Sequence, residues 1–383
     1  MKHSYIAKRF QSSGAGLSLD TEALAKYKDI IDLSIGDTDF TTDESIINAA
    51  FRDAKAGHTH YGDPKGDPEL IDAVCRAWEE DFGQRLPRDH VLVSASSCLG
   101  MALVMLAILD PGDEVIVFSP YFPMYREQIE LAGGVCVDVP TYASEDYAID
   151  EARLRAAITP RTKAIVFNNP TNPTGMGYDG KTLELLARVA QEHDLLIAAD
   201  EIYTTYLYEG DFCPIRTLPG MAERTITLNS FSKNFLMTGW RVGVIIAEPE
   251  LLAVMNRING SLIYSAPSVS QRAAIQALAM RKEIREKYVT AYRDRIFYSA
   301  DRIEKIPYLS LVRPKGTFYL FPGVEKTGLD EKAFCKVLLD QAHILVSPGT
   351  PFGVSAAGHF RIACTVGIDR LKAAFDRMEK LSF

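Results

Sequence analysis

The sequence lacks long apolar runs and any ordered cysteine pattern, and each absence excludes a class of protein. No segment approaches the roughly 18 consecutive apolar residues of a membrane span, and the N-terminal MKHSYIAKRFQSSG has no apolar stretch long enough for a signal peptide. The six cysteines are scattered, with no CxxC motif and no histidine at ligand spacing. We therefore expect a cytoplasmic protein with reduced, mostly buried thiols and no metal site.

A surplus of basic residues is also missing. The 42 lysines and arginines are outnumbered by 50 acidic residues, which gives a formal net charge of −8 and a sequence pI of about 5.5. Nucleic acids and membrane surfaces are bound through basic patches, so we expect neither as a partner. The rest of the composition is ordinary for a globular protein, and 383 residues are enough for two domains with substantial cores.

The middle of the chain alternates between short apolar runs and segments of helical periodicity. The helical segments include an apolar one beginning near Cys98 and others over Met124–Ala132 and Leu183–Glu192. Before them, Asp67 as N-cap and Pro68 at the first helical position predict the start of another helix. Continuous apolar strands that alternate with helices are typical of a mostly parallel sheet covered on both faces. The predicted strands are VLVSA, EVIVF, Val135–Val139, KAIVF, LLIAAD, TITLN and VGVIIA.

The pattern changes after about Val269. A long helical stretch extends to about Glu304, and short strands then mix with helices up to Phe383. We therefore predict an α/β protein with a large domain over residues 46–283 and a smaller α+β domain made of residues 1–45 and 284–383.

Polar clusters directly follow five of the predicted strands. In open parallel sheets, ligands bind beyond the carboxyl ends of the strands. Five separate segments are therefore predicted to converge on one crevice. The clusters are Ser94–Cys98, Pro120–Phe122, Asn168–Gly175, Asp200–Tyr203 and Ser230–Lys233.

Lys233 follows the strand TITLN in the segment SFSKNFLMTGWRVG. A lysine just after a strand is usually a solvated surface residue. Here it follows two serines and precedes an apolar stretch, and Arg241 comes eight residues later. A partly desolvated lysine beside a cation can be a neutral nucleophile that forms a Schiff base. Arg241 would also supply a fork of donors for a phosphate.

Asp200, in IAADEIYTTY, has two interpretations. The ordinary one is a helix N-cap after a strand. The functional one is a carboxylate that faces a heterocycle nitrogen, where the gross attraction at about 4 Å and a dielectric of about 20 is roughly 4 kcal/mol. Such a pair would keep a pyridine ring protonated as an electron sink. Tyr203 either donates to the phenolate oxygen of that ring or packs in the core.

Three further signals are less specific when taken singly. The small residues of SASSCLGMA expose helix amides that can bind an anion, although an ordinary strand-to-helix turn explains them equally well. The string NNPTNPTG is a rigid turn from which Asn172 could donate, or simply a loop. Arg361, in a strand-like FRIACTV, would be costly to bury without an anion, which either a substrate carboxylate or a structural Asp or Glu would supply.

In combination, the motifs NNPTNPTG, DEIY and SFSKNFLMTGWRVG resemble the class I/II aminotransferases of PLP fold type I. The resemblance covers essentially the whole chain, including PGDEVIV at 111–117. It implies pyridoxal 5′-phosphate (PLP) as cofactor and a seven-stranded, mostly parallel sheet between helices in the large domain. It also implies a homodimer with shared active sites and transfer of an amino group from an L-amino acid to a 2-oxo acid.

The resemblance implies a function for individual residues. Lys233 is the Schiff-base lysine and proton shuttle, and Asp200 pairs with the pyridine nitrogen. Arg361 forks onto the substrate α-carboxylate, and Gly36 and Asn172 also belong to the implied substrate-binding site. The implied contacts to the phenolic oxygen of the cofactor come from Asn172 and Tyr203, and Phe122 is implied to stack on the cofactor ring. The implied contacts to the phosphate come from Ser230, Arg241 and the backbone amides of Ser97 and Cys98. Tyr61 is implied to reach the phosphate bound by the partner subunit.

The resemblance does not identify the amino donor. Some aspartate-specific relatives use a lysine at the position of Cys98, and its absence favours a neutral, aromatic or large apolar donor. Contacts to the donor side chain would come from residues near Ser12 to Leu17, from Tyr319 and from the partner's Tyr264.

Two other functions fit part of the same pattern. A C–S β-lyase of the cystathionine β-lyase-like branch would keep the cofactor, but that branch usually departs from NPTG and from the SK…TGWRVG pattern. A non-enzymatic effector domain of a transcription regulator would need an added DNA-binding domain, and a dead copy would be expected to lose Lys233. We therefore place transamination first and β-elimination second.

Overall fold

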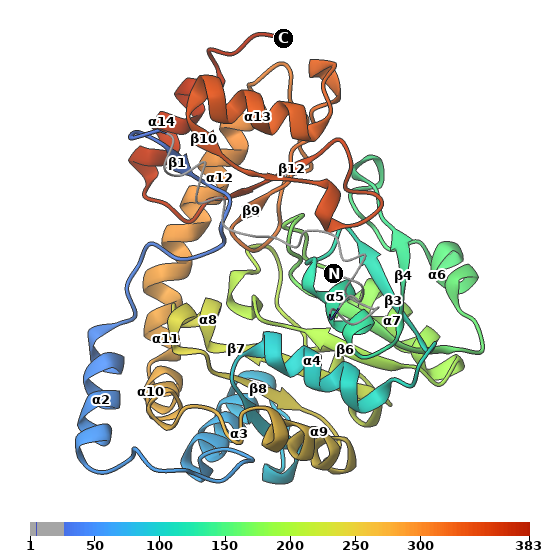
Figure 1. Cartoon of the computed structure of the whole chain (residues 1–383), viewed down its shortest axis with the longest axis vertical. Helices are drawn as coiled ribbons and strands as arrows, with labels where there is room; N and C mark the ends of the chain where they lie inside the picture. The colour runs from blue at the N-terminus through green and yellow to red at the C-terminus, as the bar shows by residue number, and fades with distance from the viewer. Residues whose placement is uncertain (1–4, 6–26) are drawn as a thin grey trace.

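The structure is a computed structural model that describes Tyr5 and residues 27–383. Within these residues, the larger part of the molecule is built on a seven-stranded sheet of order β2-β8-β7-β6-β5-β3-β4 (Figure 1). Strand β8 runs antiparallel to both of its neighbours, and the other pairs are parallel. The predicted α/β fold with a mostly parallel sheet is therefore confirmed. The strands are β2 (Val91–Ser94), β3 (Glu114–Ser119), β4 (Val135–Pro140), β5 (Thr162–Asn168), β6 (Leu196–Asp200), β7 (Thr225–Ser230) and β8 (Gly243–Ile246).

Helices cover both faces of this sheet because successive strand side chains point to opposite sides. Val115 and Val117 of β3 join a core with helices α4, α5 and α9. Ile116 and Phe118 of the same strand join a different core with α7. These helices are α4 (Ser97–Ile108), α5 (Met124–Leu131), α7 (Gly180–Glu192) and α9 (Pro249–Leu262), while the short α6 (Glu151–Ala157) lies beside β4.

A third group of helices packs against the β2–β8 side of the sheet. It comprises α2 (Glu44–Lys55), α3 (Pro68–Phe82) and α10 (Ser268–Ala279). Helix α3 begins as predicted, since the side chain of Asp67 accepts a hydrogen bond from the amide of Glu69 at 2.9 Å.

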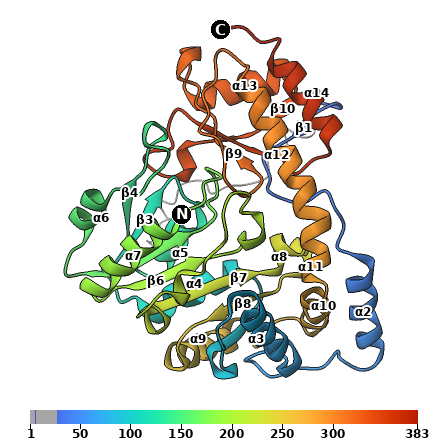
Figure 2. The same cartoon turned by 180° about the vertical axis from the view of Figure 1, so that it is seen from behind.

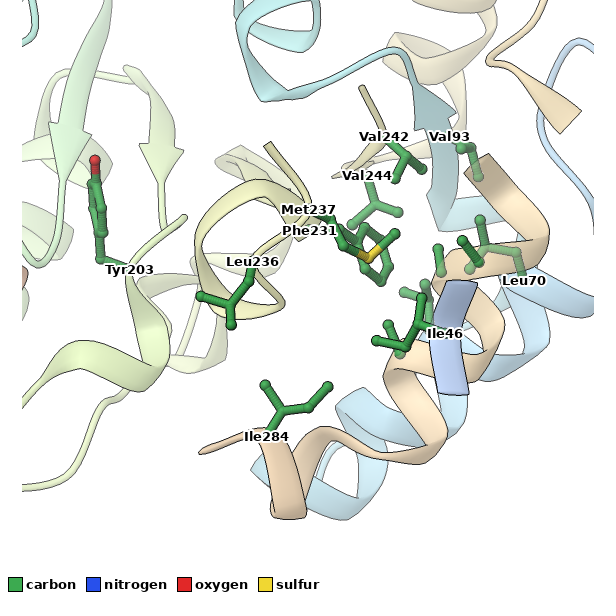
Figure 3. Packing of buried hydrophobic residues seen from close by; sticks show 14 of the residues in the cluster. Ile46, Leu70, Val93, Tyr203, Phe231, Leu236, Met237, Val242, Val244 and Ile284 are labelled. Atoms are coloured by element: carbon green, nitrogen blue, oxygen red, sulfur yellow. The ribbon is translucent and has the colours of Figure 1, made fainter. Parts of the chain in front are cut away.

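The segment around Lys233 is anchored in this same core. Phe231, Leu236 and Met237 flank the lysine and are buried with Ile46 of α2 (Figure 3). Buried side chains on both sides of the short helix α8 (Phe231–Asn234) therefore hold the backbone that carries Lys233.

The smaller part of the molecule is α+β, as predicted. Strands β11 (Ser347–Pro348), β12 (Phe360–Ala363) and β9 (Tyr319–Leu320) form an antiparallel sheet, and β1 (Ile31–Asp32) pairs in parallel with β10 (Ile344–Leu345). The N-terminal strand β1 thus joins the C-terminal region of the chain. The helices of this part are α12 (Thr290–Ile303), α13 (Glu331–Ala342) and α14 (Ile368–Met378).

A continuous helical run connects the two parts (Figure 2). It passes from α11 (Arg281–Ile284) through a π-helical turn over Arg285–Val289 into α12. The predicted division at residues 283/284 falls inside this run, and the domain boundaries stay a prediction.

The thiols differ from expectation in their burial. All six cysteines are free, but Cys364 is buried, Cys98 is exposed and the other four are half-buried, so the expectation of mostly buried thiols was wrong. Among residues 27–383, no helix is long and apolar enough to cross a membrane.

Candidate functional site

The five polar clusters meet along one edge of the large sheet. Ser94, Ser119, Asn168, Asp200 and Ser230 are the last residues of β2, β3, β5, β6 and β7. These strands run in the same direction, so their carboxyl ends lie at the same edge. The sheet of the smaller part reaches this edge as well, because a residue of β12 hydrogen-bonds to the loop after β5.

Asp200 is a buried carboxylate with one unused oxygen. Tyr125 of α5 donates its hydroxyl to Oδ2, whereas Oδ1 has no hydrogen-bond partner among the described residues. Burial raises the pKa of Asp200 to about 6, and the Tyr125 hydrogen bond opposes that rise. A buried carboxylate oxygen without a donor is costly, so this position calls for a ligand with an N–H group or a positive charge.

The amine of Lys233 is half-buried at the same edge. Its Nζ donates to the carbonyl oxygen of Gly36 and lies 5.8 Å from the centre of the Phe318 ring. The backbone carbonyl of Lys233 accepts from Tyr206 at 3.0 Å. No carboxylate forms a salt bridge with this amine in the described part of the chain, so a single hydrogen bond to a neutral carbonyl leaves it available to a ligand.

Arg361 is a buried cation with neutral partners. It lies on β12 and donates to Asn172 Oδ1 at 3.0 Å and to the carbonyl of Ser34 at 2.6 Å. Its guanidinium carbon lies 4.7 Å from the ring centre of Tyr319 and 5.0 Å from that of Phe352.

The partners of Arg361 bear on the two explanations that the sequence left open, a substrate carboxylate or a structural Asp or Glu. Neither an Asp nor a Glu pairs with it among residues 27–383, and its Nε has no hydrogen-bond partner there. Burial lowers the pKa of the Arg361 guanidinium. An incoming carboxylate would supply the missing acceptor and the missing negative charge.

Two tyrosines connect these groups. Tyr203, which follows β6, has its hydroxyl oxygen 3.1 Å from that of Tyr319 on β9. A Cβ atom added at Gly36 would lie 1.8 Å from the Tyr319 hydroxyl, so only glycine leaves room for it. In Figure 3, Tyr203 lies apart from the other labelled side chains.

A hydrogen-bond path also links Asn172 to Asp200. Asn168 Oδ1 accepts from the amide of Asn172 at 2.8 Å, and Asn168 Nδ2 donates to the carbonyl of Asp200 at 2.8 Å. The structure therefore brings Asp200, Asn172, Arg361, Tyr203, Gly36 and Lys233 together through a continuous series of contacts.

The predicted anion-binding residues lie at the start of α4. Ser96 is its N-cap with φ 94°, and Ser97 and Cys98 begin the helix, where amide N–H groups have no intrahelical partner. A Cβ at Gly243 of β8 would lie 2.8 Å from the amide nitrogen of Ser97, which shows how closely the two segments approach. Partial desolvation raises the pKa of the Cys98 thiol, and the positive charge of Arg241 opposes that rise.

Three predicted residues remain to be placed. Ser230 is buried at the end of β7 and accepts from the amide of Ser232 at 3.1 Å. Phe122 precedes α5, and its ring lies 5.7 Å from that of Tyr125. Tyr61 is 87% exposed and packs edge-on against Tyr264, and no contact in the described residues joins this pair to the groups above.

Some groups of the site were not predicted from the sequence, and some predicted residues lie outside the described part of the chain. Tyr125 was not predicted, although it lies in the predicted helix over Met124–Ala132, directly after the polar cluster Pro120–Phe122. The acceptor carbonyl of Ser34 has no sequence signal, because every residue carries a carbonyl. The predicted side-chain contacts near residues 12–17 lie outside the described part of the chain.

Comparison with known proteins gives one family. The family described as aminotransferase class I and II matches residues 28–378. The chain is 38% identical over 385 residues to the aspartate/prephenate aminotransferase of Thermus thermophilus, covering 98% of each protein. It is 35% identical over 382 residues to the arginine–pyruvate transaminase AruH of Pseudomonas aeruginosa, covering 99% of this chain and 97% of that protein.

Solved structures agree with this result. An aromatic aminotransferase from Pyrococcus horikoshii matches with a TM-score of 0.90 at 33% identity, covering 94% of this chain and 97% of that one. The Thermus thermophilus aspartate aminotransferase with maleate matches with a TM-score of 0.93 at 35% identity, covering 99% and 100%.

Proposed function

The chain belongs to the class I and II aminotransferases, and on this premise we propose that it binds PLP through Lys233 and prefers neutral or aromatic amino donors. Family membership confirms the resemblance found in the sequence. The protein is an aminotransferase, an enzyme of amino acids and 2-oxo acids, and the comparisons do not support the β-lyase alternative. The cytoplasmic location and the homodimer stay predictions.

The cofactor assignment rests on two buried charged side chains in the described part of the chain, each with one atom that has no hydrogen-bond partner. It also rests on the Lys233 amine, which is bonded only to a neutral carbonyl there. Asp200 Oδ1 lacks a donor and Arg361 Nε lacks an acceptor among the described residues. A protonated pyridine nitrogen fits the first, and a substrate carboxylate fits the second. The residues present therefore fit PLP and an amino acid.

We assign the remaining contacts by position. Tyr203 and Asn172 would hold the phenolic oxygen, and Phe122 would stack on the ring. The phosphate would be held by Ser230, Arg241 and the first amides of α4 at Ser97 and Cys98. We also assign the exposed Tyr61 to the phosphate site of a second copy of this chain. When bound, PLP supplies an electron sink that stabilises negative charge at the substrate α-carbon.

Lys233 moves the proton in this proposal. Its amine takes the proton from the substrate α-carbon and, once protonated, acts as the acid that returns a proton, so one residue is base and acid in turn. The anchoring of α8 by Phe231, Leu236 and Met237 holds that amine in place. Asp200, with Tyr125 on one oxygen, keeps its negative charge near neutral pH because its pKa of about 6 is still below 7.

Replacing Arg361 with glutamine is expected to raise KM for both the amino acid and the 2-oxo acid about 10- to 100-fold, the cost of a lost charge-assisted pair. Both substrates carry the same carboxylate, so both KM values should rise together in steady-state assays. Arg302→Gln, which removes an arginine bonded to Asp376 on α14, serves as the control and should leave both values unchanged. A selective effect on one substrate would contradict the assignment.

Replacing Tyr125 with phenylalanine is expected to move the acidic limb of the pH profile of kcat/KM to higher pH by about 1–2 units. The variant removes a hydrogen bond to a charged carboxylate, worth about 1.5–3 kcal/mol, so Asp200 would lose its charge at higher pH. Tyr308→Phe, which removes another buried hydroxyl, is the matched control. An unmoved acidic limb would show that Tyr125 does not support the Asp200 charge.

The donor preference is supported by three features. Cys98 offers no positive charge to a distal carboxylate, the aromatic rings of Tyr319 and Phe352 lie on Arg361, and one matching solved structure is an aromatic aminotransferase. The test is an absorption titration of the PLP-loaded protein with single amino acids and no 2-oxo acid. Bleaching of the visible band by an aromatic or neutral donor, with one oxo acid per site, would support the proposal, and a dominant response to aspartate would reject the preference.

A further inference from the structure

Tyr319 occupies a central position among the groups of the site. It is 2% exposed and comes from β9 of the smaller part, where it pairs with Ala363 of β12. Its hydroxyl lies 3.1 Å from that of Tyr203, and its ring lies under the guanidinium of Arg361 at 4.7 Å. Its hydroxyl also lies against Gly36, whose carbonyl accepts from Lys233. One side chain thus touches the neighbours of both the cofactor and the substrate carboxylate.

We propose that Tyr319 is a positioning residue whose hydroxyl donates to Tyr203 and thereby strengthens the hydrogen bond from Tyr203 to the phenolic oxygen of the cofactor. This inference rests on the proposed function, which assigns Tyr203 to that oxygen.

The direction of the hydrogen bond follows from counting hydrogens. A tyrosine hydroxyl carries one hydrogen and can also accept. Because Tyr203 gives its hydrogen to the cofactor oxygen in the proposed function, the hydrogen between the two tyrosine oxygens must come from Tyr319. No other acceptor for the Tyr319 hydroxyl is present among residues 27–383, so the donation to Tyr203 has no competitor there.

A donor chain of this kind has a consequence for the cofactor. Each hydrogen bond in a buried chain polarises the next and strengthens it by about 10–30%. Stronger donation from Tyr203 withdraws negative charge from the phenolic oxygen. The nitrogen joined to Lys233 then loses its proton at a lower pH, because less negative charge remains beside it.

The test is the pH midpoint of the visible absorption band of the PLP-loaded protein, measured without substrate. Tyr203→Phe is expected to raise the midpoint by about 1–2 pH units, the value of a lost hydrogen bond to a charged oxygen. Tyr319→Phe keeps the ring and is expected to raise the midpoint by about 0.1–0.6 unit, which is 10–30% of the shift expected for Tyr203→Phe.

The double variant distinguishes an effect of the Tyr319 hydroxyl that acts through Tyr203 from an effect that does not need the Tyr203 hydroxyl. In the Tyr203→Phe background, the further change Tyr319→Phe should leave the midpoint unmoved, because no hydroxyl remains to be polarised. Tyr147→Phe, which removes a buried hydroxyl without a partner in the described residues, is the matched control and should not move it in either background. Additive shifts, or no shift in Tyr319→Phe alone, would overturn the inference.

A third variant tests the contact with Arg361. Tyr319→Leu removes the ring and is expected to raise KM for the amino acid about 2- to 30-fold, the range of a cation–π contact, and by more than Tyr319→Phe, which keeps the ring. If the wild-type protein has no visible band, the assignment of Lys233 fails. If the band is present but its pH midpoint is the same in the wild type and in Tyr319→Phe, the proposed effect of Tyr319 on Tyr203 fails while the assignment of Lys233 stands.

Discussion

Replacing Lys233 with alanine is expected to remove aminotransfer almost completely. Loss of general acid–base catalysis alone costs about 10²- to 10⁴-fold in rate, and the variant also loses the amine that would bind PLP covalently. The purified variant incubated with PLP should therefore lack the stable visible band of a lysine-bound cofactor. Single-turnover rates with an amino donor and the absorption spectrum measure the two effects separately.

The fold should survive this change. Lys233 makes one side-chain hydrogen bond in the described residues, to Gly36, and its segment is anchored by its neighbours rather than by the lysine itself. The circular dichroism spectrum should match that of the wild type, with a stability change of about 1 kcal/mol. Lys65→Ala, at a half-buried lysine whose amine donates to the carbonyl of Asp89 at 3.2 Å, serves as the control for the loss of a positive charge. Near-wild-type turnover of the Lys233 variant would refute the central assignment.

Replacing Asp200 with asparagine is expected to have opposite effects on function and on stability. The activity should fall by about 10²- to 10³-fold, the usual cost of removing a preorganised charge from an active site. The affinity for PLP should fall as well, because a neutral amide does not hold the pyridine nitrogen in its protonated form. Equilibrium dialysis with PLP and steady-state kinetics measure these two losses.

The cofactor-free variant should be more stable than the wild type near neutral pH. The pKa of Asp200 is raised from 3.8 to about 6 in the folded protein, so the folded state binds this proton more tightly than the unfolded state does. Stability is therefore lost as the pH rises from about 4 to about 6, and above that range the cost is about 2–4 kcal/mol. Asparagine carries no charge and avoids this cost.

Denaturant unfolding of the cofactor-free proteins at two pH values tests this directly. The Asp200→Asn variant should exceed the wild type by about 1–3 kcal/mol at pH near 7.5 and by little at pH near 4. Glu201→Gln is the matched control, since Glu201 is the adjacent buried carboxyl and its pKa is raised to about 8 by burial. That carboxyl is largely protonated at pH 7.5, so its replacement should leave activity intact. Equal stability of the Asp200→Asn variant and the wild type at pH 7.5 would contradict the buried-charge account.

The order and type of the main elements, and the residues with the most distinctive chemistry, could be predicted from the amino-acid sequence alone. The apolar runs predicted all seven strands, and Asp67 with Pro68 predicted the start of α3. Lys233, Asp200 and Asn172 could be selected because each lies at or shortly after the carboxyl end of a strand, and strand direction then places them at one edge of the sheet. These are consequences of local periodicity and chain order, which a single sequence contains.

The hydrogen-bond partners of those residues could not be predicted from the sequence and follow from the folded structure. Arg361 meets Asn172 across 189 positions, Lys233 meets Gly36 across 197, and Tyr203 meets Tyr319 across 116. The sequence left open whether Arg361 pairs with a structural carboxylate, and it did not select Tyr125 as the partner of Asp200. Such pairings depend on how the two parts of the molecule pack together, because hydrogen bonds extend only about 3 Å while the partners are set by the positions of distant segments.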